Sequence, residues 1–278
     1  VWQKNSLLLG ISPIIKQAIE KKGGMHMTMQ EFFIQNPAAA VAFSGGVDSA
    51  WLLHEARTWA RRTAAYFVRT PFQPDFELED ARDTARRLGA ELTVIEFDIL
   101  TVPQAAANPP DRCYHCKRAL FTRLLEAARA DGLPLVLDGC NASDDASDRP
   151  GMAALKELGV RSPLRECGLT KGDIRAAARR AGLPVWNKPS YACLATRIPA
   201  GTPITGDLLA RVARGEAALM ARGFTDFRLR LRGDGALLQV RAEQMDMARE
   251  ALAGLEELLR GDFARIALDS APRSARET

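Results

Sequence analysis

The sequence predicts an α/β fold in which a parallel sheet organises the first part of the chain and a small α+β unit forms the second. Short apolar runs and helical patterns alternate between Ala38 and Phe97, and the pattern changes after the proline- and glycine-rich stretch 199–203. Strands that alternate with helices at this spacing pair in parallel through right-handed crossovers. We therefore predict an α/β domain over 27–200 and a small α+β domain over 201–278.

The composition is typical of a soluble globular protein. The chain has 278 residues, of which 47% are hydrophobic and 26% charged, and its net charge is +4. This length predicts about two domains with room for a sizeable core. The small positive charge suits anionic small molecules and gives no reason to expect a nucleic-acid partner. No apolar run approaches the ~20 residues that a membrane-spanning helix requires, so we expect no membrane partner.

Residues 1–26 differ in pattern from the rest of the chain and end in Gly23-Gly24-Met25-His26. We interpret them as a tag or an upstream extension, with Met27 or Met29 as the natural start, and a native N-terminal helix is the alternative. The segment lacks the long apolar core and small-residue cleavage site of a signal peptide. We therefore expect a cytoplasmic protein.

Each element is predicted from periodicity and from the residues that end it. In the first domain we expect a buried strand from Ala38, a helix at 50–61, a strand at 64–68, a helix at 76–88 that Gly89 ends, and a strand at 91–97. A long helix from Arg112, a strand at 135–137, a polar loop at 140–151 and a helix at 171–181 capped by Thr170 follow. The second domain should contain helices at 207–222 and 245–260 and strands at 226–231, 236–241 and 263–268.

A glycine-rich turn joins the first strand to the first helix and consists of Ser44, Gly45, Gly46, Val47, Asp48 and Ser49. Glycines allow a sharp turn whose N–H groups closely approach phosphate oxygens, and the helix N-terminus adds positive potential there. The serine hydroxyls could bind phosphate, and the Asp48 carboxylate could hold Mg²⁺. The turn lacks the lysine of a Walker A motif. We interpret it as a phosphate-binding loop rather than an ordinary tight turn.

The five cysteines predict reduced thiols, because their number is odd and no export signal is recognised. Cys113 and Cys116 are three residues apart on the long helix, which places both thiols on one helical face. A structural zinc ion is one interpretation of this pair, and it would need a fourth ligand from Cys140, Cys167 or His115. Unliganded thiols are another. Cys193, taken alone, would more often be a small core residue.

The turn resembles the PP-loop of the ATP pyrophosphatases, which split ATP between its α and β phosphates and leave AMP on a substrate. Further motifs follow in order: RCYHCK, NASDDASDRPGM, LTKGDIR with GLPVWNKPS, and CLATRIPAGTPIT. Together they resemble the LarE family over about residues 30–270. LarE proteins are sulfur transferases that make the nickel-pincer cofactor of lactate racemase-type enzymes. The resemblance implies an adenine nucleotide alpha hydrolase-like PP-loop domain with a cysteine site over 27–200, and a substrate or oligomerisation domain over 201–278.

The family implies an enzyme that activates pyridinium-3,5-biscarboxylic acid mononucleotide with ATP as an acyl adenylate and then replaces AMP with sulfur. ATP and Mg²⁺ would bind the PP-loop, and Lys117 and Arg149 would compensate the phosphate charge; an exposed cation is the alternative for each. Cys193 matches the sulfur-bearing cysteine of the family, and Arg197 could lower its pKa by favouring the anion. In the sacrificial branch of the family this cysteine gives up its own sulfur.

Cys113, Cys116 and Cys193 resemble the three cysteines of another branch. This resemblance implies a 4Fe-4S cluster with one iron open for an added sulfide. Sulfide or another donor would then supply the sulfur, and the enzyme would not consume itself. A tRNA thiolase of the PP-loop class is the alternative function, for which a strongly basic surface or an added RNA-binding domain would be expected. A nucleotide-binding module with structural zinc is a third.

Three arginines, Arg228, Arg230 and Arg232, alternate along a predicted strand and therefore share one face. Solvated edge charge is one interpretation. The functional one is a clamp, chiefly of Arg228 and Arg230, for the phosphate of the substrate, because guanidinium groups suit phosphate. Glu216 and Asp246 could add a metal site nearby. We also expect a homo-oligomer, since symmetric oligomers are common and the second domain could supply an interface.

Overall fold

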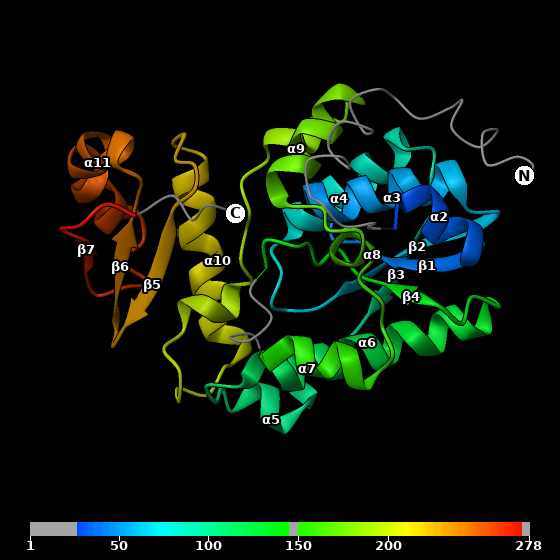
Figure 1. The fold of residues 1–278 in the computed structure, drawn as a ribbon. Helices are drawn as coiled ribbons and strands as arrows, with labels where there is room; N and C mark the ends of the chain where they lie inside the picture. The colour runs from blue at the N-terminus through cyan, green and yellow to red at the C-terminus, as the bar shows by residue number, and fades with distance from the viewer. Residues whose placement is uncertain (1–26, 145–149, 274–278) are drawn as a thin grey trace, which may run out of the picture.

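The structure is a computed structural model that describes residues 27–144 and 150–273. Two sheets organise these residues, one of four strands and one of three. Figure 1 shows the larger sheet with helices on both faces and the smaller sheet at the other end of the molecule, with α10 (Gly206–Met220) between them. The predicted α/β fold class with a parallel sheet is confirmed.

The four strands of the larger sheet are all parallel and lie in the order β3-β2-β1-β4. They are β1 (Ala38–Ala42), β2 (Arg62–Arg69), β3 (Leu92–Glu96) and β4 (Val136–Leu137). The chain runs outward from β1 to β3 and then returns to place β4 on the other side of β1. The strand order therefore reverses between β1 and β4, and ligands of such sheets bind at this switch point.

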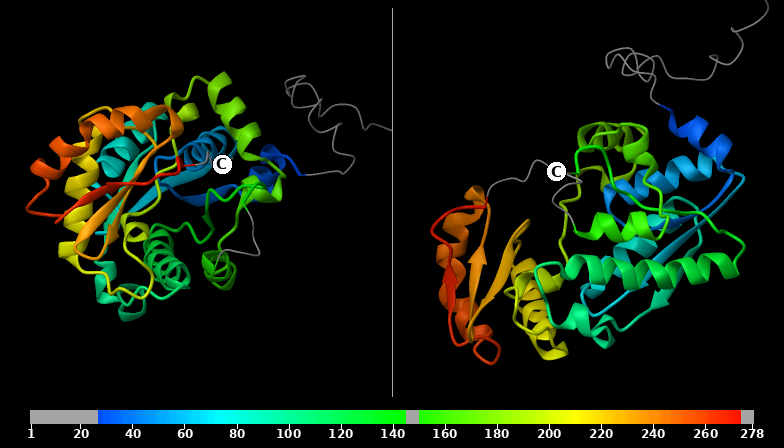
Figure 2. Two further views of the ribbon diagram at one scale, coloured as in Figure 1. Left: turned by 90° about the vertical axis from the view of Figure 1, so that its left-hand side faces the viewer. Right: turned by 60° about the horizontal axis from the view of Figure 1, so that its bottom comes forward.

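Helices cover both faces of the larger sheet, because successive strand residues point to opposite sides. Val41 packs in one core with α2 (Met29–Gln35), α3 (Val47–Trp59), α4 (Asp75–Arg87) and α9 (Lys171–Arg180). Ala40 and Tyr66 pack in another with α6 (Arg112–Ala130) and α7 (Pro150–Glu157). Figure 2 shows these layers from two further directions. None of the helices within the described ranges is both long and apolar enough to cross a membrane.

Short helical segments complete the first part of the chain. They are η1 (Ile99–Thr101), α5 (Pro103–Ala106), α8 (Pro163–Glu166), η2 (Pro184–Asn187) and η3 (Leu194–Arg197). Thr170 caps α9 as predicted, and its hydroxyl accepts the N–H of Asp173. The predicted helix start at residue 50 is wrong by three residues: α3 begins at Val47, so the glycine-rich turn supplies the first helical residues. The predicted polar loop at 140–151 gives way to α7 at Pro150.

The smaller unit is a three-stranded sheet with two helices. β5 (Arg228–Arg232) and β6 (Gly235–Gln239) are antiparallel, and β7 (Ile266–Leu268) pairs in parallel with β6. The short η4 (Ala242–Gln244) leads into α11 (Met245–Leu258). A Cβ at Gly215 of α10 would lie 2.3 Å from the Leu229 side chain, so α10 packs directly against β5.

The two units share one hydrophobic core. Leu229 and Leu238 of the smaller sheet belong to the same buried cluster as Phe72, Ile99 and Ile198 of the first part of the chain. Packing is therefore continuous across residue 200, and the domain boundary there stays a prediction. The shared core holds the two units in a fixed relation around the space between them.

Candidate active site

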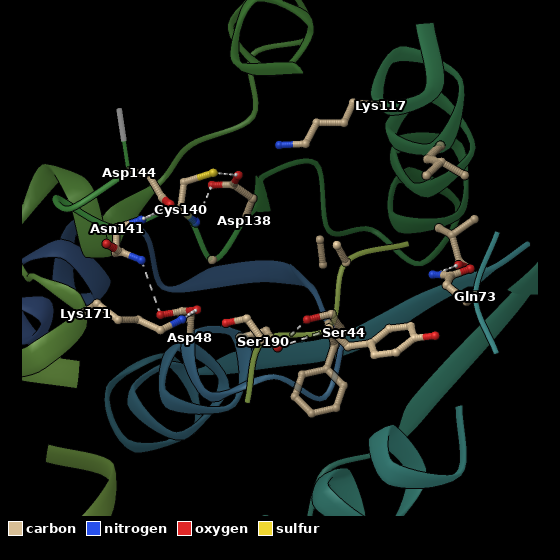
Figure 3. Close-up of a pocket in the computed structure, with 18 of the residues that line it drawn as sticks. Ser44, Asp48, Gln73, Lys117, Asp138, Cys140, Asn141, Asp144, Lys171 and Ser190 are labelled. Carbon is tan, nitrogen blue, oxygen red and sulfur yellow. Dashed lines mark hydrogen bonds and ion pairs between the residues drawn. The ribbon is translucent and has the colours of Figure 1, made fainter. Parts of the chain in front are cut away.

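A cavity of about 620 Å³ lies at the carboxyl ends of β1, β2 and β4 and extends to the smaller unit. Ser44, Asp48 and Ser49 form part of its wall at one end, and Asp226, Arg228 and Arg273 at the other. Figure 3 shows side chains from the PP-loop (44–49), from α6 and from the loop after β4 around this space. The cavity is therefore at the switch point of the sheet, where the strand order predicts a ligand.

The PP-loop is shaped by backbone geometry. Gly45 has φ +72°, and a Cβ there would lie 2.8 Å from the backbone of Ala81 in α4. Only glycine fits such a position without strain. Ser49 closes the turn, because its Oγ accepts the N–H of Ser44 at 3.2 Å and donates to the carbonyl of Gly46 at 3.1 Å. Val47 is buried beneath the loop.

Asp48 forms an ion pair that the sequence analysis missed. Nζ of Lys171 lies 2.6 Å from Oδ2 of Asp48, and Nδ2 of Asn141 lies 3.4 Å from its Oδ1. Lys171 is the first residue of α9, and its side chain is 10% exposed. The motif LTKGDIR contains this lysine, but a charged residue at a helix start is usually exposed. Its role becomes visible only when α9 is placed beside the PP-loop.

The Lys117 side chain extends from α6 into the cavity (Figure 3) and passes beside Gly151 of α7. A Cβ at Gly151 would lie 2.7 Å from Cδ and 3.1 Å from Cε of Lys117, so glycine leaves the space through which the lysine stem passes. Lys117 therefore remains a candidate for compensating phosphate charge. Arg149, the other predicted cation, is outside the described residues.

Cys140 also lines the cavity but is not suited to act as a thiolate. Its Sγ lies 2.7 Å from Oδ2 of Asp138, to which the thiol donates. Burial and the Asp138 carboxylate raise the pKa of Cys140 to about 12. The thiol is therefore protonated near neutral pH.

Two arginines line the far end of the cavity, the buried Arg228 and the partly exposed Arg273. Arg228 donates from Nη2 to the carbonyl of Ser190 at 3.3 Å, and burial lowers its pKa to about 10. Arg273 donates to Asp226 at 3.2 Å. Arg230, by contrast, bonds to Gln239 at 2.7 Å and to a backbone carbonyl, and it does not line the cavity. Of the predicted clamp, Arg228 is the member that reaches the cavity wall, and Arg273 was not predicted.

Glu216 and Asp246 lie in different surroundings and do not form the expected metal site. Glu216 is buried, and its Oε1 lies 2.7 Å from Nε of Arg197. Its side chain also accepts the Leu229 N–H at 3.0 Å. Asp246 is exposed at the start of α11, where it pairs with Arg249. Glu216 therefore neutralises a buried arginine rather than offering free oxygens to an ion.

Long-range hydrogen bonds bring the start of α6 against the segment that carries Cys193. The buried Asn108 side chain donates to the carbonyls of Pro199 at 2.8 Å and Thr202 at 3.1 Å. Arg112 donates to Oδ1 of Asn108 at 2.7 Å and to the carbonyl of Ala195 at 3.0 Å. These bonds join segments that are 83 to 94 residues apart in the chain. The cysteine pair of α6 is thereby held beside the loop of Cys193.

The thiols of Cys113, Cys116 and Cys193 are near enough to influence one another. Burial, and then the neighbouring Cys193 and Cys113, raise the pKa of Cys116 to about 12. Burial also raises the pKa of Cys193, against the opposing effects of Arg112 and Arg197. Arg197 acts to lower the pKa of Cys193, as expected, but the net shift is upward. Arg197 favours the anion, but burial has the larger effect.

A single metal ion and an iron–sulfur cluster make different demands on the three thiols. Within 27–144 and 150–273, no three His, Cys, Asp or Glu side chains converge as one metal ion requires. A zinc ion would need all its ligands about 2.0–2.3 Å away. An iron–sulfur cluster takes one thiolate on each of several irons, so its ligands surround a larger body. The described residues contain no such group for a single ion, and a cluster on Cys113, Cys116 and Cys193 stays a prediction.

The other candidate zinc ligands are engaged elsewhere. His115 pairs with Asp111, with 3.3 Å between Nε2 and Oδ2. Cys140 is bonded to Asp138 in the cavity wall, and the pKa of Cys167 is raised to about 12 by burial and by Glu166. Neither cysteine is among the groups that shift the pKa of Cys116 or Cys193.

A glycine-rich turn at the switch point of a parallel sheet, opening into a cavity, is the arrangement of a nucleotide-binding α/β enzyme. No protein-family model matches the chain. The chain is 36% identical over 218 residues to an uncharacterised protein of Synechocystis sp., covering 78% of this chain and 81% of the relative. It is 35% identical over 202 residues to the pyridinium-3,5-bisthiocarboxylic acid mononucleotide synthase of Lactiplantibacillus plantarum, covering 72% of this chain and 73% of that enzyme. The chain belongs to the LarE family and is an ATP-dependent sulfur transferase.

A more distant relative supports the class. The tRNA-specific 2-thiouridylase MnmA of Acidithiobacillus ferrooxidans is 28% identical over 177 residues, which cover 53% of this chain and 50% of MnmA. The similarity to this tRNA enzyme is lower and shorter than that to the mononucleotide synthase. The comparison therefore does not favour the alternative of a tRNA thiolase.

Proposed function

We propose that the protein converts pyridinium-3,5-biscarboxylic acid mononucleotide to its thiocarboxylic acid form. A substrate carboxylate oxygen attacks the α phosphorus of ATP, pyrophosphate leaves, and an acyl adenylate forms. Sulfur then attacks the acyl carbon, and AMP leaves with the electron pair of the broken C–O bond. The substrate is inferred from the relative in Lactiplantibacillus plantarum, whose name states its product.

One observation carries the proposal: a single cavity is lined by the glycine-rich turn 44–49 at one end and by Arg228 and Arg273 at the other. The turn offers backbone N–H groups, two serine hydroxyls and the start of α3 to the phosphates of ATP. Asp48 would hold Mg²⁺, which neutralises the departing pyrophosphate when bound. Arg228 and Arg273 would bind the phosphate of the substrate mononucleotide, since desolvated guanidinium groups bind phosphate strongly. Arg230 would support Arg228 from the same strand face.

The thiols lie beside this cavity. Lys117, which follows Cys116, and Ala192, which precedes Cys193, both line the cavity. We propose that Cys113, Cys116 and Cys193 hold a 4Fe-4S cluster, which supplies an open iron that can carry an added sulfide. Burial raises the pKa values of Cys116 and Cys193, so a bound cation would stabilise their thiolates. The chain's own part would be to group the thiols and to place the acyl carbon nearby.

The proposal is tested by metal analysis and product analysis on the same preparation. Protein purified without oxygen should contain about four irons and four acid-labile sulfides per chain, and Cys193→Ala should lose them. With ATP, Mg²⁺, sulfide and the mononucleotide, the wild type should release pyrophosphate and form thiocarboxylate over several turnovers.

Each departure from these results has a distinct meaning. Conversion of Cys193 to dehydroalanine after one turnover, without iron, would place the enzyme in the sacrificial branch. Stoichiometric zinc would make the cysteines structural. Asp48→Ala should abolish pyrophosphate release, and unchanged release would remove the PP-loop from the reaction.

A further inference from the structure

The ion pair between Lys171 and Asp48 places an ammonium group on the carboxylate that the PP-loop offers to a ligand. Nζ of Lys171 lies 2.6 Å from Oδ2 of Asp48, and the two side chains are 10% and 22% exposed. Both side chains line the cavity, as Figure 3 shows. The pair is therefore part of the cavity wall and not a contact between two exposed helices.

The backbone of Lys171 is held in place by hydrogen bonds, whereas its side chain has several rotatable bonds. Thr170 and Asp173 form a reciprocal cap at the start of α9, and the N–H of Lys171 donates to Oγ of Ser143 at 3.0 Å. The stem of a lysine is flexible, so its ammonium group can change partners without movement of the helix. From this anchor Lys171 can serve two acceptors in the same cavity.

Asp48 already has a donor on each carboxylate oxygen. Nδ2 of Asn141 lies 3.4 Å from Oδ1, and the orientation of this amide follows from its own oxygen, which accepts the N–H of Ser143 at 2.9 Å. A divalent cation at Asp48 would be repelled by an ammonium group on the same carboxylate. Metal binding at Asp48 therefore requires Lys171 to leave Oδ2.

A departing Lys171 needs another anionic partner, because an unpaired buried ammonium group is strongly unfavourable. The phosphate oxygens of a nucleotide in the same cavity provide that partner. A metal ion arriving alone does not, so the pair opposes binding of the free metal. Metal and phosphate arriving together satisfy both groups at once.

We propose that Lys171 is a phosphate-binding residue that Asp48 holds until a metal–nucleotide complex arrives. On binding, Asp48 exchanges Lys171 for the metal, and Lys171 moves to the phosphates that leave as pyrophosphate. The pair thereby makes the site selective for metal–phosphate complexes over free cations. This inference rests on the proposed function, since it takes ATP as the ligand of the PP-loop.

The test uses Lys171→Met, which keeps the length of the stem and removes the charge. Binding of Mn²⁺ without nucleotide is measured by electron paramagnetic resonance, and binding of ATP with Mg²⁺ by calorimetry. In Lys171→Met the Kd for Mn²⁺ should fall about tenfold, while the Kd for Mg²⁺–ATP should rise about tenfold. Lys171→Arg keeps the charge and should leave Mn²⁺ binding as in the wild type. Lys156→Met, an exposed lysine of α7, controls for the change in net charge.

A purely structural ion pair gives a different result. Lys171→Met would then lower the melting temperature, with Mn²⁺ binding unchanged or weaker, and that result would overturn the inference. A folded Lys171→Met that binds Mg²⁺–ATP as the wild type does would overturn it as well. Failure of the proposed function gives another result: the wild type would then bind no ATP. Mn²⁺ binding to the wild type and to Lys171→Met could still be compared in that case.

Discussion

The two halves of the active site are built in different ways. The nucleotide end depends on the local backbone: Gly45 at φ +72°, the serine that closes the turn and the start of α3 lie within six consecutive residues. The cysteine end depends on buried side chains from distant segments, above all Asn108, Arg112 and Arg197. Local geometry can be recognised in a sequence, whereas side-chain bonds between distant segments require the fold.

The largest effect should come from the buried charge of the cysteine end. Arg197→Met leaves Glu216 buried without its cation, which should lower the free energy of unfolding by about 3–5 kcal/mol. Arg214→Met removes an arginine from an exposed pair with Asp262 and should cost about 0–1 kcal/mol. Urea unfolding of both variants measures the difference. Equal losses would contradict the view that the cysteine end depends on buried charge.

The nucleotide end should respond to backbone substitution. Gly45→Ala combines a positive φ with a Cβ 2.8 Å from the Ala81 backbone, and it should cost about 2–3 kcal/mol and prevent ATP binding. At Gly46 a Cβ would meet Oγ of Ser44 at 3.5 Å, an ordinary contact, so Gly46→Ala should cost about 1 kcal/mol or less. Thermal unfolding and ATP calorimetry distinguish the two. A larger loss at Gly46 would mean that the turn is not held by its backbone.

The carboxyl group of Glu77, on α4, interacts with the cations of Lys188 and Arg197. Burial raises the pKa of Glu77 to about 7, although Lys188 and Arg197 oppose it. A carboxyl group whose pKa is raised on folding contributes stability that is fully present at pH values below its unfolded-state pKa. That contribution is lost as the pH rises to about 7. Between pH 5 and pH 8, the free energy of unfolding of Glu77→Gln should therefore decline by about 1–2 kcal/mol less than that of the wild type. Unfolding free energies at pH 5 and 8 measure it, with the exposed Glu79→Gln as control; an unchanged slope in Glu77→Gln would refute the assignment.

The smallest effect on stability should come from Gly151, which leaves room for the Lys117 stem. Gly151→Ala should change the unfolding free energy by less than about 1 kcal/mol, because the lysine can move aside. Displacement of its ammonium group should nevertheless raise the KM for ATP about tenfold. Gly254→Ala, on α11 with no atom near the added Cβ, is the matched helical control. A normal KM in Gly151→Ala would remove Lys117 from the nucleotide end.

The sequence predicted the order of strands and helices, the PP-loop and its position at the end of β1, because each depends on local periodicity and on glycine. The Thr170 cap was predicted for the same reason. The partner of Asp48 was not, since Lys171 lies 123 residues further along the chain. The net upward pKa shift of Cys193 was not predicted either, because the neighbouring arginine is visible in the sequence and the burial of the thiol is not.

The long separations at the cysteine end have a consequence for biosynthesis. A chain that emerges from the ribosome N-terminus first completes β1 to β4 and then α9, ending at Arg180, before Pro199 and Thr202 exist to accept the Asn108 bonds. The counterion of Arg197, Glu216, is synthesised later still. The nascent protein therefore passes through a stage with a formed phosphate loop and a cysteine pair that has no third thiol in place. A cluster held by the three cysteines, as proposed above, would therefore load after Glu216 has been synthesised.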